Sequence, residues 1–186
     1  MLLFVQDVLS SGTVLFCLVT IDFHAEVPLA QHIDYPTIAP DAYKAMAGLG
    51  IYIRHSGLLE PNLLELVKTR VSQINRCAFC LDMHTKDARA NGETEQRLYA
   101  LSAWRDTTFF TDRERAALSW AEALTEISAK NVPDDLQADM LKTFSEKELI
   151  DLTVAIVAIN GWNRLSIACH TPAGSYQPRN IHFPGA

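Results

Sequence analysis

The sequence predicts an all-α protein, folded as a compact helical single domain. From residue 40 onward apolar residues recur at helical spacing, two capping boxes open helices, and Pro and Gly stand where helices begin and end. The chain of 186 residues is 48% hydrophobic and 20% charged. A single core can therefore form without disulfide bridges.

The first two predicted helices each carry their apolar residues on one face. Pro40 and Asp41 begin a helix that ends before Gly57. Pro61 begins the second, because proline is tolerated in a first helical turn. The apolar faces are Ala42, Met46, Leu49 and Ile53 in the first helix, and Leu63, Leu64, Val67, Val71 and Ile74 in the second.

The third predicted helix begins at Cys77 and runs to Asn91. Gly92 follows it and supplies a C-cap that tolerates positive φ. A short helix over about 98–104 comes next.

Capping boxes predict two further helix starts. In a capping box a hydroxyl side chain caps the first turn, and a Glu three positions later accepts a hydrogen bond from the backbone N–H of the capping residue. The two boxes are Thr111 with Glu114, and Ser145 with Glu148. Between them we expect a helix over 131–144 with Pro133 in its first turn. The last element, from Leu149 to about His170, is rich in Ile and Val, but its length favours a buried helix over a strand.

The chain divides into three predicted parts. Residues 33–178 form the domain, and residues 179–186 are a C-terminal tail. The Gly/Pro-rich stretch from Ala173 to Ala186 is expected to wrap a surface or a partner. Residues 1–32 are an N-terminal extension, either loosely ordered or the product of a start codon assigned too far upstream. Its apolar run is too short to span a bilayer, and Asp7 stands where a secretory signal has basic residues.

Charge and cysteine content exclude several classes of protein. The net charge of −6 provides no basic field for nucleic acid, and no Lys/Arg cluster suits an anionic membrane. Four cysteines do not make a secreted disulfide framework, so we expect a reducing compartment, the cytoplasm. Cys17 and Cys169 are expected to be small buried apolar groups.

The stretch CAFCLDMH carries the chemistry. On a helix turning about 100° per residue, Cys77, Cys80 and His84 come round to nearly one face. Unpaired backbone N–H groups at the helix start favour an anion, which lowers a thiol pKa from about 8.5 toward neutrality. The thiolate is the reactive form, and a histidine one turn away can carry its proton.

Other interpretations of this stretch remain open from the residues alone. A zinc site would need His84 together with the distant Cys169 or His170, since the sequence holds no second C-x-x-C. The cysteines could also be purely structural. Glu65 on its own would be a solvated acid that pairs with Lys68 or Thr69.

The order Glu65, Cys77, Cys80 and His84 resembles the core motif of the alkyl hydroperoxidase D and carboxymuconolactone decarboxylase superfamily. The resemblance covers residues 33 to about 178 and is strongest to the peroxidase-related branch. It implies an alkyl hydroperoxidase D-like helical fold and assembly as a homo-oligomer. Since no second C-x-x-C is present, we expect no bound metal, and we expect no cofactor. The resemblance also implies thiol-dependent peroxide reduction, in which the two cysteines cycle between dithiol and disulfide while Glu65 and His84 relay protons.

The expected partners are a peroxide substrate and a dithiol or thioredoxin-like reductant. The alternatives are a thiol-disulfide oxidoreductase that serves another protein, and a non-catalytic helical oligomer that senses redox state. The cysteine pair disfavours lactone decarboxylation, because the true decarboxylases of the superfamily lack it. Trp104, Trp120 and Trp162 offer apolar surface for assembly, and Trp162 is expected in the core or an interface.

We expect Cys80 to attack the peroxide and Cys77 to resolve the resulting sulfenic acid. A helix dipole favours Cys77, but contributes only about 0.3 to 1 kcal/mol at an exposed helix end. His84 follows Cys80 by one turn, and a positioned base is worth roughly 10²- to 10⁴-fold in rate. Resemblance to the alkyl hydroperoxidase D family points to the second cysteine as well.

Overall fold

The computed structural model describes residues 3–8, 14–19 and 31–178, with side chains from residue 31 onward. The chain forms two separate units, Met1–Ala30 and Gln31–Ala186. The predicted tail at 179–186 and the side chain of Cys17 lie outside the described part.

The N-terminal unit contains a two-stranded antiparallel hairpin. Strands β1 (Leu3–Val8) and β2 (Val14–Val19) pair from Leu3 opposite Val19 to Val8 opposite Val14. These strands were not among the elements predicted from the sequence. Two runs of β-branched and aromatic residues separated by a Gly-containing segment are nevertheless typical of a hairpin.

The described part of the second unit is helical, which confirms the all-α class for this domain. It contains α1 (Tyr35–Ile38), α2 (Pro40–Ser56), α3 (Pro61–Asn75), α4 (Ala78–Ala90), α5 (Glu95–Ala100), the 3₁₀ helix η1 (Leu101–Asp106), α6 (Asp112–Thr125), α7 (Leu136–Met140) and α8 (Glu146–Ala168). Within the described ranges, no helix is both long enough and apolar enough to cross a membrane.

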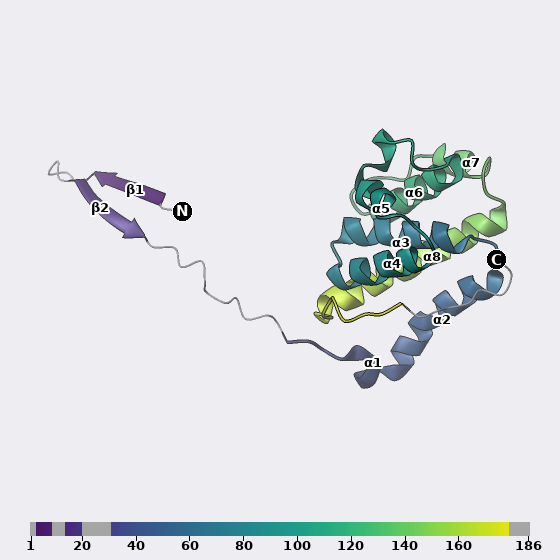
Figure 1. Ribbon diagram of the computed structural model, residues 1–186, viewed down its shortest axis with the longest axis horizontal. Coiled ribbons are helices and arrows are strands. Elements are labelled where there is room, and N and C mark those ends of the chain that lie inside the picture. Colours follow the sequence, from purple (N-terminus) through teal and green to yellow (C-terminus); the bar gives the residue numbers. More distant parts are fainter. Residues whose placement is uncertain (1–2, 9–13, 20–30, 179–186) are drawn as a thin grey trace. The chain divides into compact units, whose positions relative to one another are not determined.

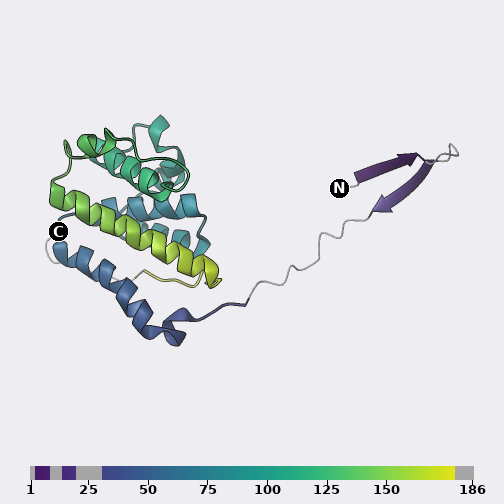
Figure 2. The same ribbon diagram turned by 180° about the vertical axis from the view of Figure 1, so that it is seen from behind.

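Helix α3 is the centre of the domain and packs against α4, α6 and α8 (Figure 1). Helix α8 runs along the whole domain, and α2 lies against it (Figure 2). The interior is made of aliphatic side chains that burial removes from water, among them Leu66, Val67, Val71, Leu152 and Ile156. Helices α3 and α4, which carry Glu65 and His84, therefore pack against a close-packed core.

Most helix ends lie where the capping boxes and glycines of the sequence predicted them. Both capping boxes form, at Thr111 and at Ser145. Gly57 and Gly92 follow α2 and α4 with φ of 64° and 90°, a left-handed conformation that suits glycine. Helix α8 begins directly after Ser145, three residues before the predicted start at Leu149.

Two predicted helices were wrong in extent. The helix expected over 131–144 is only α7, Leu136–Met140. Pro133 lies before its start, which no side chain caps, and the buried Phe144 lies beyond its end. The short helix expected over about 98–104 begins earlier, where Thr94 caps α5, and continues as η1.

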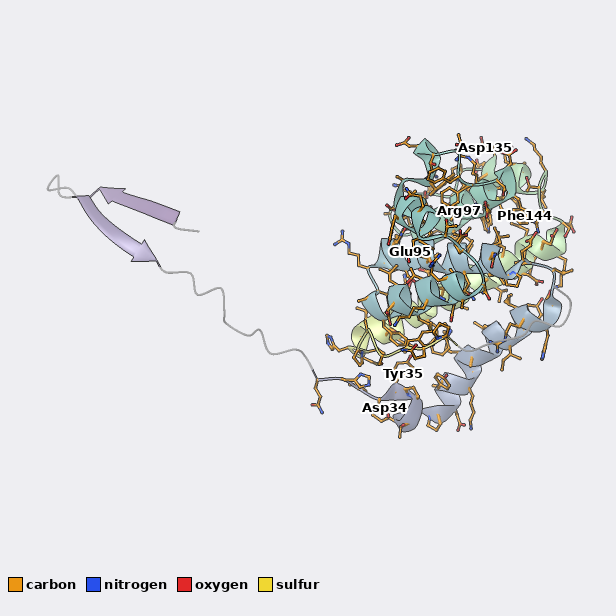
Figure 3. The ribbon with its side chains drawn as sticks, viewed as in Figure 1. Asp34, Tyr35, Glu95, Arg97, Asp135 and Phe144 are labelled. Atoms are coloured by element: carbon orange, nitrogen blue, oxygen red, sulfur yellow. A yellow bond between two sulfur atoms is a disulfide. The ribbon has the colours of Figure 1, made fainter. Side chains whose placement is uncertain are left out.

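The aromatic side chains and Cys169 also differ in part from expectation. Trp104 and Trp120 are buried within the domain rather than on its surface. Trp162 is partly buried, as expected, and its ring lies 6.4 Å from that of Tyr35, labelled in Figure 3. Cys169 is only half-buried, contrary to prediction, because it is the C-cap of α8 at the domain surface.

Candidate active site

The turn between α3 and α4 positions the two site cysteines. Arg76 adopts a left-handed conformation, with φ of 59°, and ends α3. The backbone N–H of Cys77 then donates to the carbonyl of Ser72 at 3.1 Å. Cys77 is the N-cap of α4, so the sequence prediction that it starts this helix is correct.

Cys77 and Cys80 form a disulfide, with their Cα atoms 5.4 Å apart. Each residue is only 1% exposed. The backbone N–H of Cys80 donates to Sγ of Cys77 at 3.4 Å, so the first sulfur caps its own helix. The site therefore holds two bonded sulfurs at a buried helix N-terminus, where the helix dipole favours negative charge.

Glu65 and His84 meet across the interface of α3 and α4. Nδ1 of His84 lies 2.8 Å from Oε2 of Glu65, and both residues are buried. Nζ of Lys68 lies 2.7 Å from the other carboxylate oxygen. Glu65 is thus not a solvated acid: it pairs with Lys68, whereas the buried side-chain hydroxyl of Thr69 has no hydrogen-bond partner within the described structure.

The charge on Glu65 decides which ring nitrogen of His84 can act as a base. Burial raises the pKa of Glu65, but Lys68 and His84 more than offset it and lower the pKa to about 2. The carboxylate is therefore ionised at neutral pH and can only accept hydrogen bonds. The tautomer follows from this bond: Nδ1 of neutral His84 carries the proton, and Nε2 has the free lone pair.

On the side that faces the cysteines, His84 makes no hydrogen bond to a sulfur within the described residues of this disulfide form. His84 is one helical turn after Cys80 on α4, so the two side chains share a face. The bond to Glu65 is therefore in place, while the step from Cys80 to His84 belongs to the proposed chemistry below.

Asparagine side chains of α8 fix the end of α3, and sequence reasoning missed them. Asn75 donates to Oδ1 of Asn160 and of Asn163 at 2.9 and 2.8 Å, and Asn163 donates to Ser72 at 3.0 Å. Asn163 is fully buried. Two asparagines three residues apart in an apolar helix were the available signal, because buried amides need partners.

Asp87 is a second acid beside the Glu65–His84 pair, also missed by sequence reasoning. Within the described residues it is the one further ligand-type side chain grouped with Glu65 and His84, with the three candidate atoms within 4.8 Å of one another. Such a group could hold a metal ion. Lys68, however, already occupies one oxygen of Glu65, and a neighbouring ammonium disfavours a cation.

The structure does not support the zinc interpretation. Over residues 31–178, no group of three potential ligands includes Cys169 or His170. In the disulfide form Cys77 and Cys80 offer no thiolate to a zinc ion.

Comparison with known proteins agrees with this geometry. The pattern of the carboxymuconolactone decarboxylase family matches residues 40–123. YdfG, an uncharacterized protein of Bacillus subtilis (strain 168), is 44% identical over 147 residues, which cover 79% of this chain and 99% of YdfG. This chain belongs to the carboxymuconolactone decarboxylase family. The resemblance seen in the sequence motif is thereby confirmed.

Solved structures of similar proteins share the fold of this family member. A protein of unknown function from Agrobacterium tumefaciens, ATU0492, described as a candidate antioxidant defence protein AhpD, is 40% identical with a TM-score of 0.74, covering 78% of this chain and 99% of its own. The debrominase Bmp8 is 20% identical with a TM-score of 0.67, covering 75% of this chain and 74% of its own. At that identity the second likeness concerns the fold alone.

Proposed function

We propose that this chain is a thiol-dependent peroxidase that reduces hydrogen peroxide or small organic hydroperoxides. The observation that carries the proposal is the buried Glu65–His84 pair, whose histidine lies one helical turn after Cys80 of the bonded cysteine pair on α4. A dithiol supplies the two electrons that peroxide reduction needs, and a histidine of fixed tautomer supplies the base.

In the first step Cys80 transfers its thiol proton to Nε2 of His84. The thiolate attacks one peroxide oxygen, an S–O bond forms and the O–O bond breaks. The departing alkoxide, or hydroxide when the substrate is hydrogen peroxide, takes the proton back from His84 and leaves as an alcohol or as water. Glu65 stabilises the imidazolium that exists between these two transfers.

In the second step Cys77 attacks the sulfenic sulfur of Cys80. The S–S bond forms and the S–O bond breaks. The departing hydroxide takes the thiol proton that Cys77 gives up and leaves as water. An external dithiol then reduces the disulfide by thiol exchange and is itself oxidised, which closes the cycle.

Two features of the helix start bear on which sulfur attacks. Cys77 receives the backbone N–H of Cys80, which stabilises its thiolate. At a partly buried helix end a dipole contributes up to about 2 kcal/mol, more than at an exposed end. A base worth roughly 10²- to 10⁴-fold still outweighs it. We therefore assign attack to Cys80, and the stabilised thiolate of Cys77 suits the resolving role.

Burial of the sulfurs restricts what can reach them. Both are at 1% exposure, which suits peroxides of a few atoms better than bulky ones. A thioredoxin-like reductant is far larger than a peroxide. Its approach to this disulfide requires side chains over the site to move, whereas a small dithiol needs a smaller opening.

We also propose a homo-oligomer that works in the cytoplasm, where thiols are kept reduced. Ile150 and Val157, seven residues apart on α8, are each 57% exposed and share one helix face. An apolar face of this kind is typical of a subunit contact.

Counting thiols tests the peroxidase proposal against its alternatives. Reduced protein, with Cys17 and Cys169 replaced by Ser, receives one equivalent of peroxide. Rapid loss of both remaining thiols, with turnover once a dithiol is added, supports the peroxidase. Loss only with a disulfide partner indicates a thiol-disulfide oxidoreductase, and slow loss without turnover indicates a redox sensor.

A further inference from the structure

The segment after α8, residues 171–178, returns along the side of α4 (Figure 1). Nζ of Lys86 donates to the carbonyls of Gly174 at 3.3 Å and of Tyr176 at 2.9 Å. The backbone N–H of Gly174 donates to Oδ2 of Asp82 at 3.0 Å. Asp82 and Lys86 pair with each other as well, so one ion pair of α4 holds this segment in place.

The same segment places the hydroxyl group of Tyr176 beside the candidate site. Oη of Tyr176 donates to Oδ1 of Asp87 at 2.8 Å, across 89 positions of sequence. Asp87 is three residues after His84 on α4, and its carboxylate lies within 4.8 Å of the ligand-type atoms of Glu65 and His84. A residue outside the C-x-x-C-x-x-x-H motif therefore contacts a group beside the base.

The state of Asp87 depends on every charged group that faces it. Burial raises its pKa, and the charge of Glu65 on α3 raises it further. The hydrogen bond from Tyr176, together with His84 on α4 and Lys68 on α3, acts in the opposite direction. The net effect is a raised pKa for Asp87, and the Tyr176 bond is the largest contribution that favours its charged carboxylate.

We propose that Asp87, held by Tyr176, is a positioning residue of this site that stabilises the imidazolium formed on His84 when Cys80 gives up its proton. The inference rests on the proposed function for the identity of base and sulfur. The step moves one proton from Sγ of Cys80 to Nε2 of His84 and transfers no electrons. A negative charge near the ring favours its protonated form, and so favours the thiolate.

The test reads the thiolate directly and uses no peroxide. In the full chain carrying Cys77→Ser, residue 80 stays a free thiol, and mass spectrometry follows its alkylation by iodoacetamide across pH. Adding Asp87→Asn is expected to raise the midpoint of this profile by about 0.5 to 1 pH unit, the effect of one charge about 5 Å away in a partly solvated site. Tyr176→Phe is expected to raise it by less.

Asp139→Asn is the matched control, because it removes one negative charge from an exposed residue of α7 and should leave the profile in place. A midpoint unchanged in both Asp87→Asn and Tyr176→Phe overturns the inference. If Asp87→Asn fails to fold by circular dichroism, the Tyr176→Phe profile decides. A shifted profile in a chain that does not reduce peroxide would reject the proposed function and keep the role of Asp87.

Discussion

Glu65 on α3 and His84 on α4 form a hydrogen-bonded pair, 2.8 Å between Oε2 and Nδ1, that joins the two helices at the candidate site. Because the carboxylate is ionised, it fixes the tautomer that leaves Nε2 as the base. Glu65→Gln keeps the shape of the side chain and removes its charge.

We expect Glu65→Gln to slow peroxide-dependent oxidation of the thiols at least tenfold, and His84→Ala to slow it about 10²-fold. Stopped-flow measurement of tryptophan fluorescence after mixing with peroxide gives these rates. Equal rates for Glu65→Gln and wild type would show that the pair is structural only.

The lowered pKa of Glu65 also makes stability depend on pH. Its folded value, about 2, lies below the ordinary value of 4.5, so the stabilisation is complete above pH 4.5 and is lost as the pH falls toward 2. We expect wild type to lose about 2 kcal/mol more unfolding free energy than Glu65→Gln between pH 7 and pH 3. Urea titrations at the two pH values measure this difference. Parallel losses in both proteins would contradict it.

Arg76 holds a left-handed conformation, with φ of 59°, directly before Cys77. A residue with a Cβ is strained there by about 1 to 2 kcal/mol, whereas glycine is not but loses about 0.5 to 1 kcal/mol of chain entropy. Arg76→Gly should therefore raise the unfolding free energy by about 0.5 to 1 kcal/mol in urea titration. Arg76→Ala, which keeps the Cβ, is the control and should show no gain.

The apolar face of α8 gives a prediction about assembly. Val157→Asp should shift the sedimentation coefficient toward the monomer, because a buried unpaired charge opposes the contact. Ile127→Asp is the control. The side chain of Ile127 is 58% exposed, close to the 57% of Val157, but Ile127 lies outside α8. Wild type that sediments as a monomer at micromolar concentration would reject the oligomer itself.

The sequence allowed the helices with local signals to be predicted, since capping boxes and Pro or Gly at helix ends act within one turn. The α7 region was overestimated because Pro133 was taken to stand in a first helical turn, whereas α7 begins at Leu136 without any side-chain cap. Cys169 was misplaced for a different reason: its burial depends on where α8 meets the surface, which spacing does not encode.

For the site, helical spacing alone predicted that Cys80 and His84 share one helix face. Only the resemblance to the family motif indicated that Glu65 belongs with them. Asp87 and Tyr176 could not be joined by sequence reasoning, because their hydrogen bond spans 89 positions and depends on the path of residues 171–178. Lys68 was foreseen as a partner of Glu65, but in a solvated pair rather than in the buried pair with His84.

Trapping the sulfenic acid tests the central claim most directly. Cys77→Ser and Cys80→Ser variants, each with Cys17 and Cys169 replaced by Ser, are treated with peroxide and a sulfenate-specific reagent, and mass spectrometry locates the adduct. The proposed chemistry predicts an adduct on residue 80 in Cys77→Ser and none in Cys80→Ser, because His84 serves the second sulfur. An adduct on Cys77 of Cys80→Ser, formed as fast as that on residue 80, would contradict it and assign the attack to the helix N-terminus instead of the Glu65–His84 pair.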